Sequence, residues 1–405
     1  MIQFPIEVKA LRVVQPIGEY YVAVLPANVL LEVAYSDVLS ARSGLDGRPY
    51  ELEGTQRLVQ KERLQSITDY INRTDAAFPN AVIVAANFRQ EDGLIEDDES
   101  ESVEQPVEKI NKRWTVEESN DGCYVLRIPT SSKLAAIIDG QHRLYAFANA
   151  RFERLEMNLV CSIFLDLPKP YQAQLFATIN STQKRVDKSL TYELFGYNIE
   201  EENEKFWSPD KLAVFLTRRL FTDIESPLKG RIVIAPQKDD VLSLLGQDAS
   251  WKVSTAVVVE GIMRLYTSNP KKDTTNLLDG NRKERIALKE MRNDRSPLRE
   301  AYLNTQDKVI YKMTLNFLLA CDQVFWQRAQ QNSYITKTVG VQALFDIFRI
   351  TAGDSYQSQN ISINYFINRF GAAKDIDFST ETFRNASGSG RTTIKNAIAT
   401  TMGLA

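Results

Sequence analysis

The sequence predicts an α+β protein in which a mixed α/β core follows a β-rich lead-in and precedes a mainly α-helical second half. Short runs that alternate apolar and polar residues open the chain, as at residues 20–25, and are typical of strands. Strand-like and helix-like runs then alternate up to about residue 200. Beyond Gly196, apolar residues recur mostly at helical spacing, as in residues 211–220, 255–266 and 309–326.

Chain length and composition predict the domains. At 405 residues the chain is too long for one ordinary core, and we expect a lead-in at 1–44, a core domain at 45–200 and a helical domain at 201–405. An acidic insertion near 91–105 interrupts the core domain, because residues 91–104 hold eight acidic side chains and no basic one. Like charges at this density oppose packing, so we expect an exposed loop there.

The first elements of the core domain follow from local patterns. Leu64, Ile67 and Ile71 repeat at helical spacing and predict an amphipathic helix within residues 56–72. The apolar run at residues 81–86 predicts a strand.

A strand, a tight turn and a helix are predicted next. The apolar run 134–138 leads directly into Asp139-Gly140-Gln141-His142-Arg143, and helical spacing begins at Leu144. A further strand at 159–165 precedes a helix that Pro168 and Pro170 open.

Composition excludes several classes of protein. A hydrophobic fraction of 43% and a charged fraction of 25% exclude collagen-like, coiled-coil and wholly disordered chains, and a net charge of −3 argues against a uniformly basic nucleic-acid coat. The three cysteines lie far apart and fit reduced thiols. Because no signal peptide or membrane span is recognised, we expect a cytoplasmic protein that does not bind membranes.

The single histidine restricts the chemistry further. Motifs that need two histidines, such as HExxH zinc sites and two-histidine iron sites, are excluded. A serine-histidine-aspartate triad would have to use His142 as its base.

The turn at Asp139–Arg143 has two readings from geometry alone. Gly140 allows a close backbone approach, and the helix start provides N–H groups to which His142 and Arg143 add charge, which suits a phosphate. In the other reading Asp139 caps the helix, Gly140 serves the turn and Arg143 is a surface cation.

The turn also resembles a known family signature. Residues 138–146, Ile-Asp-Gly-Gln-His-Arg-Leu-Tyr-Ala, are similar to the DGQHR-domain family, which includes the DndB and DpdB proteins of DNA-modification clusters. A second stretch at 176–186 fits the same family, and Gln56, Arg57 and Arg63 fit it less sharply. The resemblance covers roughly residues 45–200 and implies work in DNA modification and phage defence.

The DGQHR family in turn resembles the ParB/sulfiredoxin superfamily, in which a Gly-x-x-Arg turn holds nucleotide phosphates. Here that turn is Gly140 to Arg143. Gln141 stands where sulfiredoxin has its reactive cysteine, so redox repair is not expected. Ile179 replaces the acidic residue of the ParB magnesium box while Asn180 is kept, and Asp139 or another carboxylate would have to supply the missing ligand.

The resemblance implies a role for each site residue. The expected catalytic residues are His142 and Arg143, as phosphate ligands, and Asp139, as an orienting or metal-linked carboxylate. The expected nucleotide contacts are Gly140, Gln141, Asn180, Gln183, Gln56 and Arg57. The expected cofactor is ATP or another nucleoside triphosphate, to which Mg²⁺ is the candidate companion, and the residues that would bind a metal are left open.

Two functions of different classes remain open at this stage. The preferred one is a nucleotide-binding ATPase that acts with a DNA-modification enzyme on DNA. The alternative is a DndB-like transcriptional repressor that binds operator DNA, and a structural scaffold of the modification complex ranks third. DNA is the expected partner, and a modification enzyme and a second copy of the chain are further candidates.

A basic stretch in the second half is a separate candidate for DNA contact. Residues 271–300 hold nine basic and six acidic side chains. If the segment is one helix, Arg285, Lys289 and Arg292 share a face at i, i+4 and i+7, which could contact phosphates. Mixed charge of this kind is also typical of a solvated helix.

Overall fold

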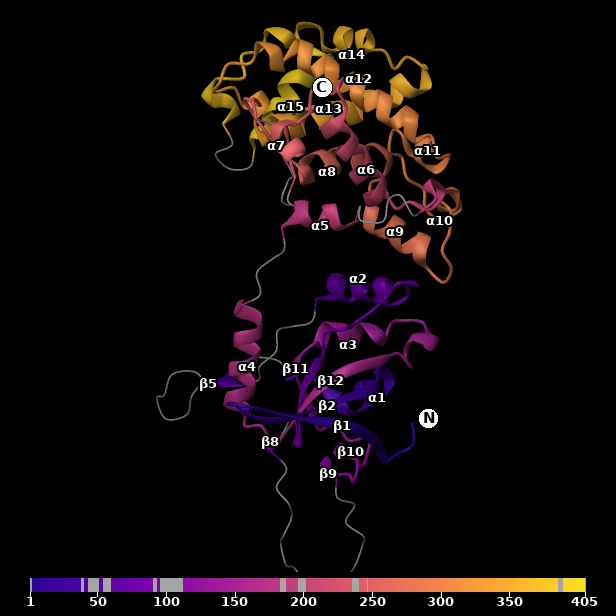
Figure 1. The fold of residues 1–405 in the computed structure, drawn as a ribbon, viewed down its shortest axis with the longest axis vertical. Helices are drawn as coiled ribbons and strands as arrows, with labels where there is room; N and C mark the ends of the chain where they lie inside the picture. Colours follow the sequence, from indigo (N-terminus) through magenta and orange to yellow (C-terminus); the bar gives the residue numbers. More distant parts are fainter. Residues whose placement is uncertain are drawn as a thin grey trace, which may run out of the picture. The chain divides into compact units, whose positions relative to one another are not determined.

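The computed structural model shows two compact units, Met1–Lys184 and Arg185–Ala405. It describes residues 2–37, 40–42, 51–53, 60–89, 93–94, 112–182, 187–195, 202–234, 240–245, 247–384 and 389–404. Strands gather in the first unit and helices in the second (Figure 1). The predicted α+β class and the mainly helical second half are confirmed.

One mixed sheet organises the first unit. Its strands are β1 (Ile6–Gln15), β2 (Gly18–Pro26), β3 (Ala34–Tyr35), β6 (Val82–Ala86), β9 (Thr115–Glu118), β10 (Tyr124–Ile128), β11 (Ala135–Asp139) and β12 (Asn158–Leu165). They lie in the order β3-β11-β6-β12-β2-β1-β10-β9, with β3–β11 and β6–β12 parallel and the other pairs antiparallel. Two small hairpins complete the described strands of this unit, β4 (Ser40–Arg42) with β5 (Glu51–Glu53), and β7 (Phe88–Arg89) with β8 (Gly93–Leu94).

Helices cover both faces of this sheet. They are α1 (Ala27–Val33), α2 (Lys61–Ile71), α3 (Gln141–Phe147) and α4 (Lys169–Thr182). Alternate side chains of β11 enter opposite cores, since Ile137 packs with apolar residues of α1, α2 and α3, whereas Ile138 packs with Phe176 of α4. Strand β11 and the turn after it are therefore held from both sides.

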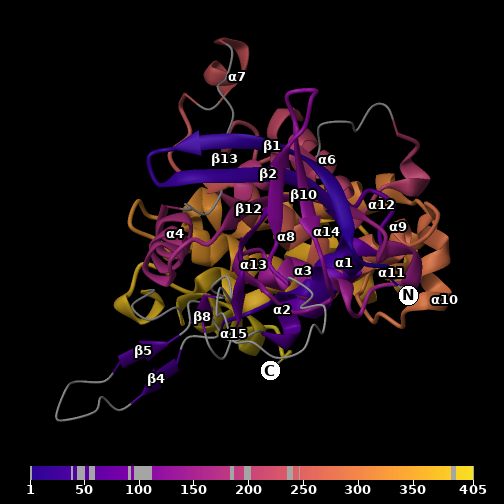
Figure 2. The same cartoon turned by 90° about the horizontal axis from the view of Figure 1, so that it is seen from below.

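The β-rich opening of the chain does not stand apart from the core. Strands β1 and β2 form a long antiparallel pair (Figure 2), and β1 pairs with β10 while β2 pairs with β12. A two-stranded ribbon alone is marginally stable, and its edges are satisfied here by later strands. The expected lead-in at residues 1–44 thus contributes to the same sheet as the expected core domain.

The second unit is built from helices, with one short strand pair, β13 (Ile232–Val233) and β14 (Val253–Ser254). The helices are α5 (Lys188–Phe195), α6 (Pro209–Thr222), α7 (Asp240–Leu245), α8 (Thr255–Tyr266), α9 (Pro270–Leu278), α10 (Leu288–Met291), α11 (Arg299–Leu303), α12 (Asp307–Val324), α13 (Thr338–Gln357), α14 (Ile363–Phe370) and α15 (Gly390–Thr401). Within the described ranges, no helix has the length and apolar character needed to cross a membrane.

The predicted basic helical face does not form. Arg285 lies on a 3-10 turn and α10 ends at Met291, so Arg285, Lys289 and Arg292 do not share one helix. The side chain of Arg285 is fully buried, and its guanidinium donates to both carboxylate oxygens of Asp307 at 2.6 and 3.1 Å. A buried guanidinium needs such a partner, and this requirement removes Arg285 from the surface.

The packing of α8 against α13 depends on a small residue. A Cβ atom on Gly261 would lie 2.4 Å from Cγ of Phe345 on α13, which is closer than any van der Waals contact allows. A Cβ on Gly353, also on α13, would lie 3.6 Å from Cβ of Pro297, which is an ordinary van der Waals contact. Of these two glycines in helix interiors, Gly261 is required by close packing and Gly353 is not.

We expect Gly261→Ala to lower the free energy of unfolding by roughly 1–3 kcal/mol, because the added methyl overpacks the core. The matched variant Gly353→Ala should raise it by about 0.5–1 kcal/mol, because alanine loses less backbone entropy in a helix. Urea unfolding followed by circular dichroism measures both. Equal stability of the two variants would contradict the close approach of α8 and α13.

Candidate functional site

A cleft of about 460 Å³ opens in the first unit beside the turn between β11 and α3. Residues from α2, the start of β6, the turn and α4 line it: Arg63, Ile67, Asn80, Ala81, Ile83, Asp139, Gly140, Gln141, His142, Arg143, Phe176, Ile179 and Asn180. The structure thus brings the turn residues and Asn180, which lie far apart in the sequence, around one cavity. The charged lining consists of two arginines and one aspartate.

The backbone of the turn is shaped by a bulge and a glycine. The pairing of β11 with β6 shifts register between Ile137 and Asp139, and such irregularities re-aim the residues that follow. Gly140 then has φ 100° and ψ 8° at the N-cap position of α3. A Cβ there would lie 3.2 Å from Nη2 of Arg143 and 3.3 Å from both Val82 methyl groups. The position therefore favours glycine by conformation and by space.

Arg143 is engaged with the protein itself. Its Nη1 donates to the carbonyl of Asn80 at 2.5 Å, and its Nη2 donates to the carbonyl of Ala81 at 3.0 Å and to Oδ2 of Asp139 at 2.9 Å. The side chains of Arg143 and Asp139 are 20% and 30% exposed. Arg143 therefore ties the turn to the residues before β6, and its remaining N–H groups can still face the cleft.

Gln141 points into the protein wall. The residue is 3% exposed, and its Oε1 accepts a hydrogen bond from the hydroxyl of Ser36, just after β3, at 2.5 Å. The side chain thus connects the turn to the edge of the sheet, although the residue also lines the cleft.

His142 faces a cationic neighbour. Burial, and then the positive charge of Arg63, hold the pKa of His142 below its usual 6.5. The backbone N–H of Gln60 lies 3.5 Å from Nε2 of His142, which acts as the acceptor. An accepting Nε2 carries no proton, so the neutral ring has its proton on Nδ1.

Asn180 reaches the cleft from α4. Its Nδ2 donates to the carbonyl of Phe176, one turn earlier in the same helix, at 2.8 Å. The bond orients the amide within the helix, and Asn180 lies across the cleft lining from the turn residues. Three other expected contacts, Gln56, Arg57 and Gln183, lie outside the described residues, as does most of the acidic insertion.

Sequence reasoning did not assign Arg63 or Asn80 to the site. Arg63 lies on the exposed side of α2, where a cation is ordinary, and only the distant packing of α2 on α3 brings it to the cleft. Asn80 acts through its backbone carbonyl, for which the side-chain identity gives no signal. The weak family resemblance around Arg63 was the one available hint.

The lining suits an anion better than a bare metal ion. Asp139 is the one carboxylate among the lining residues and is already paired with Arg143. Across the described part of the chain, no group of three or more His, Cys, Asp or Glu side chains could hold a metal ion. Arginine side chains and N–H groups at a helix start instead match the acceptor oxygens of a phosphate.

Comparison with known proteins gives one match. The model of the DndB family, described as DNA-sulfur modification-associated, matches residues 8–207. This range contains the cleft and nearly all of the first unit, and the match associates the chain with DNA sulfur modification. No curated protein and no solved structure matches the chain. The wider likeness to ParB and sulfiredoxin stays a prediction.

We expect Gly140→Ala to destabilise the first unit by more than the roughly 1–2 kcal/mol that a left-handed alanine costs, because the methyl also crowds Arg143 and Val82. The control is Gly122→Ala, where φ is 76° and the added Cβ has no neighbour within 4 Å. Urea unfolding compares the two, and equal losses would show that Arg143 does not need the space beside Gly140.

The only histidine of the chain gives one imidazole signal in a ¹H NMR titration. We expect a pKa below 6.5, moving up toward 6.5 in Arg63→Ala and unchanged in Lys61→Ala, a cation on the same helix outside the cleft. Because the unfolded chain binds this proton more readily, the stabilising contribution of neutral His142 is present above pH 6.5. It is lost as the pH falls through the lower pKa of the folded state. A pKa above 6.5 in the wild type would contradict the arrangement.

Proposed function

We propose, starting from the match of residues 8–207 to the DndB family, that the chain serves DNA sulfur modification by binding a nucleoside triphosphate in the cleft at the DGQHR turn. The observation that carries the proposal is the cleft itself, in which the turn, Arg63 and Asn180 come together. The ParB-like expectation of a phosphate-holding Gly-x-x-Arg turn agrees with this assignment.

Arg63 and His142 are proposed to contact the phosphates. Arg63 is exposed on α2 and can turn its guanidinium into the cleft without giving up a described ion pair. His142 is half-buried and neutral, and with Nε2 as an acceptor its Nδ1–H is the donor it can offer to a phosphate oxygen.

Arg143 is proposed as a positioning residue for this site. Its bonds to the carbonyls of Asn80 and Ala81 and to Asp139 fix the turn as one wall of the cleft. Because of these bonds, the side chain of Arg143 is less free than that of Arg63 to move toward a ligand.

Magnesium fits the site only together with the nucleotide. Asp139 provides one carboxylate, and Asn180 provides one side-chain carbonyl oxygen, whereas Mg²⁺ prefers six oxygen ligands. The remaining ligands would be phosphate oxygens and water. The ion would neutralise phosphate charge during hydrolysis.

For hydrolysis the described cleft offers one neutral base. The lowered pKa of His142 keeps the imidazole unprotonated near neutral pH, and a neutral ring can accept the proton of an attacking water. Its contact with Gln60 at 3.5 Å is long and readily given up.

Nucleotide binding and phosphate release test the proposal on the full chain. We expect Arg63→Ala to weaken ATP binding by calorimetry roughly 10- to 150-fold, the value of a charge-assisted hydrogen bond. Lys61→Ala, on the same helix, should bind as the wild type does. His142→Ala should reduce the release of inorganic phosphate by more than it reduces binding, because its proposed role includes proton transfer.

The outcomes separate the candidate functions. If the chain binds a nucleotide but releases no phosphate, the cleft is a nucleotide sensor and the ATPase hypothesis is rejected. No binding of any nucleoside triphosphate, with DNA binding that depends on base sequence, would replace the proposal by the DndB-like repressor. A mismatched base pair should then cost about 1–3 kcal/mol.

A further inference from the structure

A second polar cleft lies in the helical unit, most of which falls outside the family match. It has a volume of about 560 Å³ and is lined by α10 and the segment that follows it, by α11 and by the end of α13. The charged lining residues are four cations and two acids: Lys289, Arg292, Arg295, Arg299, Asp294 and Glu300. The basic stretch of the sequence therefore gathers around a cavity, although it does not form a helical face.

A buried acid anchors two of these arginines. Asp273 on α9 is fully buried and accepts from Nη1 and Nη2 of Arg299 at 2.6 and 3.1 Å and from Nη1 of Arg292 at 3.2 Å. The hydroxyl of Thr267 donates to the same carboxylate at 2.6 Å. Both guanidinium groups are thereby held in place before any ligand arrives.

Asp294 is occupied by protein donors. Its Oδ2 accepts from the N–H of Ser268 at 2.8 Å and lies 2.9 Å from Nη1 of Arg292. Its Oδ1 accepts from the N–H and the hydroxyl of Ser296 at 2.9 and 2.6 Å. Burial works against the charge, but these hydrogen bonds outweigh it and lower the pKa of Asp294 to about 2. The acid in the wall is therefore ionised, and it is paired with Arg292.

The capacity of the cleft for an acceptor lies at its rim, because Arg299 in its wall is 5% exposed and its Nε–H is buried, without a hydrogen-bond partner among the described residues. At the rim, Lys289 and Arg295 are exposed and form no ion pair with another described residue.

We propose that this second cleft binds a phosphate of the DNA backbone. A phosphodiester offers only acceptor oxygens and one negative charge, which match the fixed arginines and the two rim cations. The association of the family with DNA sulfur modification favours DNA over a free anion. The site reads no base, so it would position the duplex, and the proposal does not depend on nucleotide binding in the first unit.

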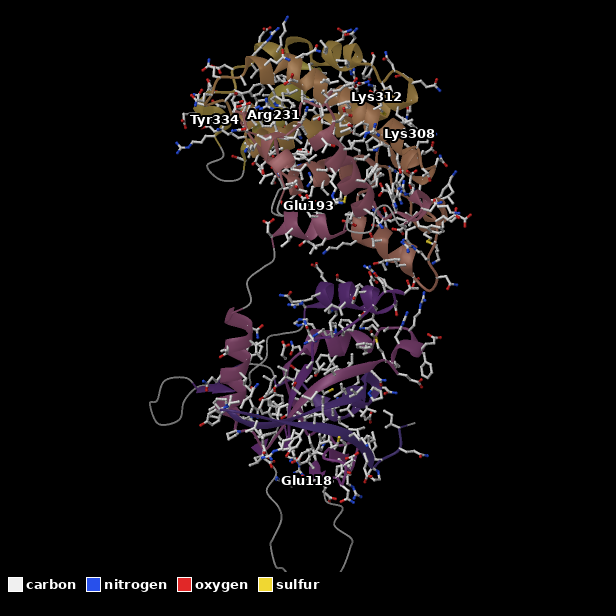
Figure 3. The ribbon with its side chains drawn as sticks, viewed as in Figure 1. Glu118, Glu193, Arg231, Lys308, Lys312 and Tyr334 are labelled. Carbon is white, nitrogen blue, oxygen red and sulfur yellow. The ribbon has the colours of Figure 1, made fainter. Side chains whose placement is uncertain are left out.

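The test measures binding of the full chain to a fluorescein-labelled duplex of about 20 base pairs by anisotropy, from about 50 to 200 mM NaCl. The variant is Lys289→Ala with Arg295→Ala, which removes two exposed cations and no described contact. The control is Lys308→Ala with Arg328→Ala, which removes the same charge outside the cleft; Lys308 lies on α12 (Figure 3).

The expected result is a change in salt dependence as well as affinity. Loss of one phosphate contact should reduce the magnitude of the slope of log K against log salt by about 0.9, while the control variant stays close to the wild type. Between about 50 and 200 mM NaCl the loss of affinity should therefore be roughly threefold smaller for the double variant than for the wild type. ATP binding and the signal of His142 should not change.

Three results would overturn the proposal. One is an equal change in the cleft variant and the control, which would show only the effect of net charge. Another is a wild type that does not bind the duplex at about 50 mM NaCl. The last is displacement of DNA by millimolar inorganic phosphate at matched ionic strength, with the double variant losing phosphate binding, because the cleft would then serve a free anion.

Discussion

The ion pair between Arg143 and Asp139 is the constraint on which the first cleft depends. It joins the last residue of β11 to the first turn of α3, and the same guanidinium reaches back to the carbonyls of Asn80 and Ala81. A glycine at position 140 follows from this arrangement, because a Cβ would meet Nη2 of Arg143 at 3.2 Å. The polar side chains of the DGQHR turn thus depend on one another and on their neighbours. Among the described residues, Asp139, Gln141 and Arg143 each bond to a side chain, whereas His142 has a contact only with the backbone of Gln60.

Much of this unit was predictable from local sequence, and the parts that were not depend on distant partners. The strand, turn and helix around Gly140 follow from apolar periodicity and turn chemistry, and the helix of α2 follows from its apolar spacing. The inward position of Gln141 depends on Ser36, which is 105 residues away in the chain. The sheet order, with β1 and β2 between β12 and β10, depends likewise on long-range pairing that no local pattern encodes.

In the basic stretch at residues 271–300, local sequence likewise does not show which charged side chains are available to a ligand. Sequence alone treats Arg285, Arg292 and Arg299 as equivalent cations. In the structure Arg285 is buried against Asp307, Arg299 is buried against Asp273, and Arg292 bridges Asp273 and Asp294. Removing one partner of such a pair leaves a buried charge unpaired, which is strongly destabilising. These arginines therefore stabilise the fold. The charges available to a ligand are the neighbouring Lys289 and Arg295, which a count of basic residues does not distinguish.

Both clefts combine arginines locked by acids with cations that are exposed, and this combination has an energetic consequence. The locked groups, Arg143 in one cleft and Arg292 with Arg299 in the other, have lost their side-chain freedom on folding. The binding of an anion would therefore cost side-chain entropy only at the exposed neighbours. These are Arg63 in the first cleft and Lys289 with Arg295 in the second. Both proposals are therefore compatible with a net charge of −3, because the acids beside the locked arginines are already paired with them.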